Sequence, residues 1–416
     1  MITQFQNGFS DLALKTLIVF LVLGRPMPES ERDTYVALAG GLFAIPFILF
    51  SLFGGWLADK FSKQKVMKGV KWAEIGIMVF ATGALYSELL VLEMSALFLM
   101  GCHSAIFGPS KYGILPEILP DDRLSWGNGI LELLTFIGII LGTVAGGMFA
   151  QHFGSSQYLS GVFLTALACL GLIASMFIPE TPAANPTAEP RINPVVDLKR
   201  QLLFMRSDRD LWRANWGSTG FWFVATLVQM NLTIYAKDVL SLTEQENSLL
   251  NAALALGIGL GSALAGLLSR GKIQYGLVQI GAMGMALFAV PMGFHGLGVT
   301  LFSLCLVGLG LSAGLFIVPV AAVLQHRPPP ELRGAVQGAA NLMSFIGIFA
   351  VSAVQIALNR ILHCSPGEVF WICGVVALIS GGYAAATRRN ALQDLLRAIL
   401  EPKPISEGFV VPEQES

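Results

Sequence analysis

Residues 129–139 read Gly-Ile-Leu-Glu-Leu-Leu-Thr-Phe-Ile-Gly-Ile, and residues 338–348 read Gly-Ala-Ala-Asn-Leu-Met-Ser-Phe-Ile-Gly-Ile. The two segments share their glycines and their Phe-Ile-Gly-Ile ending at a constant offset of 209 residues, which places Glu132 opposite Asn341. A repeat at half the chain length indicates a fold built from two copies of one unit. We therefore predict that the chain consists of two parallel halves of the same topology.

The composition around this repeat is that of a membrane protein. Of the 416 residues, 54% are hydrophobic and only 13% are charged, and the mean hydropathy is +0.66. Soluble domains are about one quarter charged. The apolar stretches between the clustered charges are about 20 residues long, which is enough to cross roughly 30 Å of hydrocarbon. The sequence thus predicts an all-α polytopic membrane protein.

The apolar stretches form two sets of six. The first set lies near 5–24, 34–57, 69–88, 90–113, 126–150 and 158–178. The second set lies near 212–236, 246–269, 274–295, 297–325, 333–360 and 367–387. We predict 12 transmembrane helices as two six-helix pseudo-repeats. The predicted units are an N-terminal bundle (1–180), a cytoplasmic linker (181–211), a C-terminal bundle (212–390) and a cytoplasmic tail (391–416).

The distribution of basic residues predicts the orientation. With an even number of helices both termini lie on one side, and 21 of the 26 Lys and Arg residues lie on that side or in the linker. Only Arg25, Arg32, Lys237 and Arg360 lie towards the opposite face. Because short cytoplasmic loops carry the excess of Lys and Arg, we predict a multi-pass protein with both termini cytoplasmic.

Several classes of function have no basis in the sequence. A net charge of −1 gives no reason to expect binding to nucleic acid. The five cysteines have neither disulfide nor metal spacing, so no metal or other cofactor is expected. No nucleophile–base signature or phosphate-binding loop is present, and we do not expect an enzyme.

The loop after the second apolar stretch, residues 55–65, reads Gly-Trp-Leu-Ala-Asp-Lys-Phe-Ser-Lys-Gln-Lys. It resembles the signature loop of the major facilitator superfamily, with Gly55, then Asp59 four residues on, then Lys60 and Lys63 in a basic cluster. Ser62 replaces the usual second glycine of that loop. Gly55 would allow close helix approach, Asp59 would pair with a base or a helix N-terminus across a cytoplasmic gate, and the lysines would anchor at anionic headgroups.

Ionisable residues inside the predicted spans are candidate site residues, because burying them in hydrocarbon is costly. Asp11 and Lys15 are four residues apart on one helix face and could neutralise each other. Lys111 either serves the site or extends to the membrane interface, and Asp11 and Glu132 either bind substrate or form internal ion pairs. Glu74 and His103 are interpreted as structural. The second half offers uncharged candidates instead, namely Gln229, Asn231 and Asn341.

A second motif is narrower. Residues 107–117 read Phe-Gly-Pro-Ser-Lys-Tyr-Gly-Ile-Leu-Pro-Glu and include Lys111 and Tyr112. Together with residues 5–15 around Asp11 and the glycines up to 147, this block resembles the lysophospholipid transporter branch of the superfamily, which includes forms fused to an acyltransferase and an acyl-carrier-protein synthetase. The resemblance implies uptake of lysophosphatidylethanolamine-like lipid across a bacterial inner membrane, with Asp11 and Lys111 at positions that the family uses.

The same residues leave other functions open. A proton-coupled exporter of amphipathic drugs would use Asp11 or Glu132 as its proton carrier. A membrane scaffold would dock a soluble acyltransferase through the basic linker segment 191–213. Since no acyltransferase or synthetase domain follows residue 390, the resemblance implies that any such partner is a separate chain, and a monomer is the usual state in the superfamily.

Overall fold

The computed structural model describes residues 1–189, 193–294, 296–386 and 390–400, and within these ranges the chain is helical with no strand. Twelve of the described helices have 18 residues or more. The predicted all-α fold of 12 long helices is therefore confirmed. Some residues of the predicted segments lie outside the described residues. They are 190–192 of the linker, the last residue (295) of the predicted span 274–295, the last residue (387) of the predicted span 367–387, and 401–416 of the tail.

The helices of the two halves alternate in direction along the chain. The first six long helices are α1 (Ile2–Gly24), α2 (Glu29–Lys60), α3 (Lys63–Ser87), α4 (Leu90–Gly113), α6 (Leu124–His152) and α7 (Tyr158–Met176). The second six are α9 (Arg209–Asp238), α10 (Glu244–Leu268), α11 (Tyr275–Met292), α12 (Val299–His326), α13 (Arg333–Ile356) and α14 (Pro366–Ala385). We call the end of the bundle at which α1 begins the terminal face.

Short elements connect the long helices. They are α5 (Leu115–Ile118), the 3-10 turns η1 (Asp121–Arg123) and η2 (Pro330–Leu332), the linker helix α8 (Pro194–Ser207), the π turn η3 (Ala357–Ile361) and α15 (Ala391–Leu400). The predicted span 333–360 is too long for one regular helix, because α13 ends at Ile356 and continues as η3.

Ten of the long helices are also apolar enough to cross a membrane. The other two, α3 and α9, are 25 and 30 residues long but more polar. Capping residues set several boundaries. Thr243 with Glu246 and Ser365 with Glu368 form capping boxes at the starts of α10 and α14, so that the first free backbone N–H groups of these helices are satisfied by side chains.

Glycines determine how closely helices pack within the first half. Gly138, Gly142 and Gly146 lie on one face of α6, as the GxxxG spacing predicts. A Cβ atom at Gly138 would lie 2.6 Å from the Phe5 carbonyl oxygen, and one at Gly146 would lie 2.5 Å from that of Ala13. These three glycines therefore pack against the backbone of α1.

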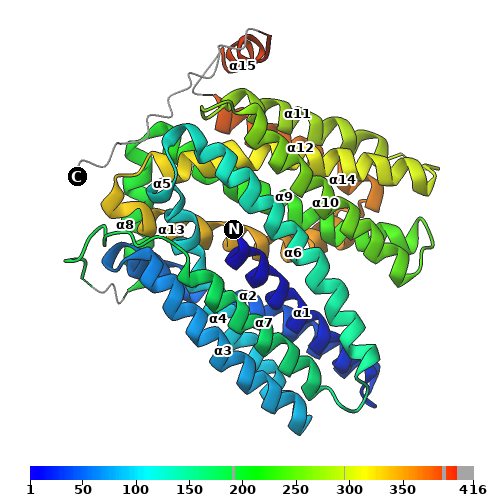
Figure 1. Cartoon of the computed structure of the whole chain (residues 1–416). Coiled ribbons are helices and arrows are strands. Elements are labelled where there is room, and N and C mark those ends of the chain that lie inside the picture. Colours follow the sequence, from blue (N-terminus) through cyan, green and yellow to red (C-terminus); the bar gives the residue numbers. More distant parts are fainter. Residues whose placement is uncertain (190–192, 295, 387–389, 401–416) are drawn as a thin grey trace.

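The two halves lie side by side and meet near the terminal face. In Figure 1, α1, α3, α4 and α7 run together through the lower part of the view, and α9, α11, α12 and α14 run through the upper part. The halves touch most extensively through two helix pairs, α2 with α13 and α6 with α10, and further contacts join α4 with α13 and α6 with α12. A Cβ at Gly129 would lie 2.5 Å from the Ser262 carbonyl oxygen, and one at Gly338 would lie 2.5 Å from that of Ser51. Backbones of opposite halves are thus in direct contact.

Candidate functional site

A small cavity lies between the halves, close to these contacts. Its volume is about 70 Å³, and its walls come from α4, α6, α9, α12 and α13. The polar residues that line it are Tyr112, Glu132, Ser218, Trp222, Gln337, Asn341 and Ser344. Glu132 and Asn341, the residues that the repeat places opposite each other, therefore face the same cavity. The buried Nε2 of Gln337 has no hydrogen-bond partner among the described residues, so a donor is available there.

An ionic group from the first half opens on this cavity. The Tyr112 hydroxyl donates a 2.8 Å hydrogen bond to the Glu132 carboxylate. The Lys111 ammonium lies 4.4 Å from the centre of the Tyr112 ring and interacts electrostatically with the carboxylates of Glu132 and Asp11. Lys111 is half-buried, and its ammonium is close enough to the carboxylates of Glu132 and Asp11 to interact with them.

Polar contacts also join the halves around the cavity. Asn341 of α13 donates a 2.8 Å hydrogen bond to the Ser51 hydroxyl of α2. The side-chain amides of Asn128 and Gln325 exchange two hydrogen bonds of 2.8 and 2.7 Å between α6 and α12, and both residues are fully buried. Buried amide pairs of this kind fix register between surfaces because an unpaired partner would be costly.

Asp11 and Lys15 do not neutralise each other. The Asp11 carboxylate accepts hydrogen bonds from Ser104 (2.7 and 2.8 Å) and Asn7 (2.9 Å), whereas the Lys15 ammonium lies 5.5 Å from the centre of the Phe43 ring. The predicted pairing is therefore wrong: the two residues share a helix face, but neighbouring helices α4 and α2 supply each with a different partner.

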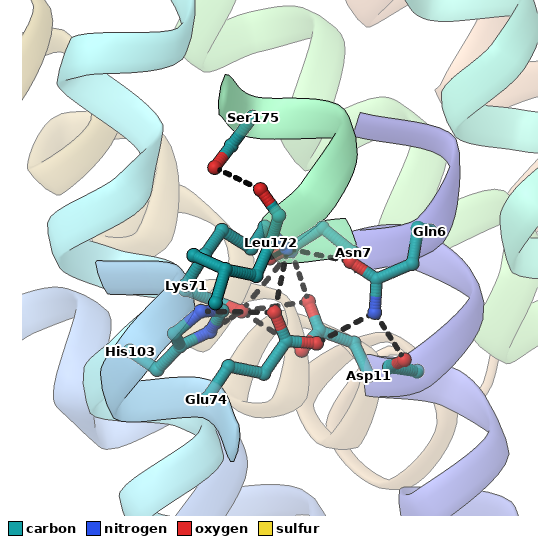
Figure 2. A network of polar contacts seen from close by, with 10 residues as sticks. Gln6, Asn7, Asp11, Lys71, Glu74, His103, Leu172 and Ser175 are labelled. Atoms are coloured by element: carbon teal, nitrogen blue, oxygen red, sulfur yellow. Dashed lines mark hydrogen bonds and ion pairs between the residues drawn. The ribbon is translucent and has the colours of Figure 1, made fainter. Parts of the chain in front are cut away.

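Asp11 belongs instead to a buried network between α1, α3 and α4, which Figure 2 shows. The Lys71 ammonium donates hydrogen bonds to Glu74 (2.6 Å), Gln6 (2.7 Å) and Asn7 (3.2 Å). Gln6 in turn donates to Glu74 (2.7 Å). Lys71 and Glu74 are both fully buried, and the ammonium lies inside a ring of acceptors that come from two helices.

His103 completes the network. Its Nε2 lies 3.5 Å from the Glu74 carboxylate and has no hydrogen-bond partner among the described residues. Lys71 was not singled out from the sequence and was counted only among the basic residues of the terminal side. The signal that could have revealed it is the three-residue spacing to Glu74, which puts a cation and an anion on one helix face next to apolar residues.

Two candidates of the second half lie away from the cavity. Gln229 is exposed, and its backbone carbonyl accepts a hydrogen bond from Thr233. Asn231 is fully buried and donates a 2.7 Å hydrogen bond to the carbonyl oxygen of Pro366 at the start of α14. The geometry of Asn231 is that of a helix-packing residue, and neither side chain lines the cavity.

Most of the segment 55–65, expected to be a loop, is helical, because α2 continues to Lys60 and α3 begins at Lys63. The last turns of α2 reach across to the second half. The buried Asp59 carboxylate accepts hydrogen bonds from the backbone N–H groups of Gly334 (2.6 Å) and Ala335 (2.8 Å) at the start of α13. A Cβ atom at Gly55 would lie 2.5 Å from the Gly334 carbonyl oxygen. Of the two partners considered from the sequence, a base and a helix N-terminus, these hydrogen bonds are with the helix N-terminus, where the helix dipole favours a carboxylate.

The lysines at the end of α2 and the start of α3 have different environments. Lys60 lies 5.1 Å from the centre of the Trp56 ring. Lys63 is fully buried and forms a 2.5 Å ion pair with Glu117. Lys65 is exposed and pairs with Glu180 beyond α7, and this pairing lowers the pKa of the Glu180 carboxyl. The predicted headgroup anchoring is therefore wrong for Lys63, because a carboxylate of the first half already binds it.

No group of three or more His, Cys, Asp or Glu residues within the described ranges has the arrangement of a metal site. The cysteines there are unpaired. The polar groups that line the cavity are one carboxylate, amides and hydroxyls from both halves, and the Lys111 ammonium lies beside the lining residue Tyr112.

Comparison with known proteins identifies the family to which this fold belongs. Residues 6–352 match the model of the Major Facilitator Superfamily. The protein named lysophospholipid transporter LplT of Klebsiella pneumoniae (strain 342) is 31% identical over 339 residues, which are 78% of each chain. The protein of the same name from Enterobacter sp. (strain 638) is 29% identical over 345 residues, again 78% of each chain.

Solved structures share the fold at low sequence identity. The human organic anion transporter MFSD10 superposes with a TM-score of 0.76 at 13% identity, covering 92% of this chain and 98% of its own. The transporter FucP in its outward conformation gives 0.72 at 13% identity, covering 92% and 97%. The chain is therefore a multi-pass membrane protein that belongs to the major facilitator superfamily, in the branch that includes the relatives named lysophospholipid transporter.

Proposed function

We propose that the protein moves lysophospholipid, with a headgroup like that of lysophosphatidylethanolamine, across a bacterial inner membrane to the cytoplasmic leaflet by alternating access. The observation that carries the proposal is the hydrogen-bonded pair Tyr112 and Glu132, which lines the cavity between the halves and has the Lys111 ammonium beside it. It occurs in a chain related to lysophospholipid transporters over most of its length.

A zwitterionic headgroup needs a cation near its phosphate and an anion near its amine. In the proposal Lys111 binds the phosphate, while Glu132 and Asp11 attract the amine. Tyr112 holds Glu132 in place, and Asn341 binds from the second half. Lys15 is not given this role, because its ammonium lies against Phe43 of α2. A cavity of about 70 Å³ admits water but not a lipid headgroup, so the halves must part before substrate enters.

The orientation follows from the basic residues, so the terminal face is cytoplasmic in this proposal. Residues 1–180 and 212–390 are then the two moving units and 181–211 connects them. The contacts of Gly55 and Asp59 with α13 close the cytoplasmic side, and Lys60 and Lys63 belong to the same gate. We further propose that the protein acts as a monomer in the lipid bilayer and that any acyltransferase or synthetase that uses its product is a separate chain.

The test is uptake of labelled lysophosphatidylethanolamine by proteoliposomes that contain the purified chain, with and without an imposed ion gradient. Protein-dependent uptake is expected, and its dependence on the gradient identifies the driving ion. Lys111→Ala should abolish uptake without loss of folded protein. Lys272→Ala is the matched control, since Lys272 is exposed near the terminal face. If folded wild-type protein moves no lysophospholipid, the proposal is refuted and export of amphipathic drugs becomes the better hypothesis.

A further inference from the structure

A second, larger hollow lies on the outer surface of the C-terminal half. This groove has a volume of about 670 Å³ and is bounded by α9, α13 and α14. Its lining is almost wholly apolar or aromatic and consists of Trp212, Trp216, Thr219, Gly220, Phe223, Met343, Ile346, Gly347, Ala350, Val376, Ile379, Ser380 and Tyr383. Its volume is within the range of pockets that bury a ligand of several hundred daltons, roughly 300–1,000 Å³.

The depth of the groove corresponds to one leaflet of a membrane. On α9 it extends from Trp212 to Phe223, a separation of eleven residues that corresponds to a rise of about 16 Å along a helix. This is about half of the roughly 30 Å of hydrocarbon in a bilayer. Trp212 and Trp216 mark the terminal end, where amphipathic aromatic residues are favoured at the headgroup level. The groove therefore occupies the leaflet next to the terminal face.

The groove and the central cavity lie on opposite sides of the same helix pair. Ser218 of α9 and Ser344 of α13 line the cavity. Thr219, which follows Ser218, and Gly347, three residues after Ser344, line the groove. We call the line along which the two helices touch the α9–α13 seam. Both hollows take part of their lining from these two helices, so the seam lies between them.

The seam is made of small side chains. The hydroxyls of Ser218 and Ser344 are 3.4 Å apart, a long contact that holds the helices weakly. A Cβ atom at Gly347 would lie 3.2 Å from the Thr219 methyl carbon. Small residues allow close helix approach without interlocking large side chains, so separation of α9 from α13 breaks few strong contacts.

A cation stands at the end of the groove near the terminal face. The Arg213 guanidinium lies 5.8 Å from the centre of the Tyr383 ring, and Tyr383 belongs to the groove lining. An apolar channel with an arginine and aromatic rings at its interfacial end matches an amphiphile with one acyl chain and a phosphate in its headgroup. A soluble metabolite has no apolar chain to bury against this lining, and a diacyl lipid has two acyl chains rather than one.

We propose that the groove between α9, α13 and α14 receives the acyl chain of a lysophospholipid that leaves the central cavity through the α9–α13 seam. The inference rests on the proposed function and adds a lipid-binding site and an exit route to it. The headgroup stays with Lys111 and Glu132 until the chain has passed into the groove, and Arg213 then contacts the phosphate at the membrane surface.

Labelling tests the site directly. Lysophosphatidylethanolamine with a photoactivatable acyl chain is irradiated with the purified protein, and labelled peptides are identified by mass spectrometry. Label is expected in residues 343–350 and 376–383, and an excess of unlabelled lysophosphatidylethanolamine should remove it at least tenfold more effectively than diacyl phosphatidylethanolamine. Equal competition by the diacyl lipid would mean that the groove holds ordinary bilayer lipid, which overturns the proposal even in a protein that transports.

Obstruction tests whether the site is used. Ala350→Trp fills the groove, whereas Ala353→Trp places the same side chain one turn further along α13, outside the groove lining. The first variant should lose at least nine-tenths of lysophospholipid transport together with the groove label, and the second should retain both. Equal transport by the two variants would overturn the exit route.

A reversible bridge tests the seam. The double variant Ser218→Cys/Ser344→Cys is oxidised with copper phenanthroline, with each single variant treated identically. Both helices belong to one half, so a disulfide between them leaves rigid-body movement of the halves possible. Transport should stop on oxidation and return on reduction to the level of the single variants. Unchanged transport in the bridged protein would overturn the seam as exit, whereas a wild-type protein that moves no lysophospholipid would refute the proposed function itself.

Discussion

The strongest prediction concerns Asp59, whose carboxylate holds the two halves together near the terminal face. Asp59 is 2% exposed and accepts hydrogen bonds of 2.6 and 2.8 Å from the first backbone N–H groups of α13. A hydrogen bond to a charged group contributes about 1.5–3 kcal/mol. Asp59→Asn keeps one acceptor oxygen, loses the charge and turns an amide NH₂ towards a backbone N–H. We therefore expect a loss of about 1.5–3 kcal/mol, the equivalent of one such bond.

This loss acts on the equilibrium between closed and parted halves. A change of 1–3 kcal/mol shifts such an equilibrium by roughly 5- to 150-fold. Hydrogen–deuterium exchange measured by mass spectrometry should show faster exchange in the last turns of α2 and the first turns of α13. Asp122→Asn is the control, because Asp122 is an exposed aspartate near the terminal face.

A second pair of helices separates parting of the halves from local fraying. Gly129 of α6 and Gly266 of α10 are in contact across the halves without any help from Asp59. If the halves part, peptides around these glycines also lose protection. If only α13 frays at its uncapped end, they do not. Unchanged exchange at Gly129 and Gly266 in Asp59→Asn would refute the conclusion that this carboxylate controls the closure.

Three further predictions concern single side chains. Lys71→Met removes the lysine partner of the buried Glu74 charge and should cost about 3–5 kcal/mol of unfolding free energy, which thermal unfolding of the purified protein measures. The double variant with Glu74→Leu should recover most of this loss, and no recovery would mean that the ion pair is not the cause. Tyr112→Phe removes the hydrogen bond to Glu132 and should raise the KM for lysophospholipid about tenfold, the effect of losing ~1.4 kcal/mol; an unchanged KM would exclude this tyrosine from the site. Gly55→Val forces a side chain into the α13 backbone, costs about 1–3 kcal/mol and should speed exchange in α2 and α13, whereas retained protection there would contradict the packing argument.

The fold could be predicted from the sequence because a bilayer imposes simple constraints. Every backbone polar group must be satisfied within its own segment, so long apolar stretches become helices. The repeat then relates the halves, and for this reason Glu132 and Asn341 could be placed opposite each other before their common cavity was seen. Helix ends were predicted less well, because caps and irregular turns such as η3 have no strong hydropathy signal.

The polar interior could not be predicted to the same degree. Lys63 was assigned to a basic cluster and Lys71 was not singled out, because the positive-inside pattern counts charges without their partners. Their burial depends on acceptors that are distant in sequence, such as Glu117 for Lys63 and Gln6 for Lys71. The Asp11–Lys15 pairing failed for a related reason. Spacing along a helix shows which residues share a face, but the neighbouring helices decide which partner each residue meets.

The same comparison shows an asymmetry that the repeat conceals. The first half contains the buried ionic residues, with Lys71 and Glu74 between α1, α3 and α4 and Lys111 beside Glu132. At the repeat position of Glu132 the second half has the neutral Asn341, and its largest described hollow is apolar. The first half thus contributes a carboxylate to the central cavity, whereas the second half contributes neutral polar groups there and an apolar groove on its outer surface. An amphiphile has the same division, and a carrier for it needs each chemistry on only one side of the path, so the loss of charge from the second half is what the proposed substrate requires.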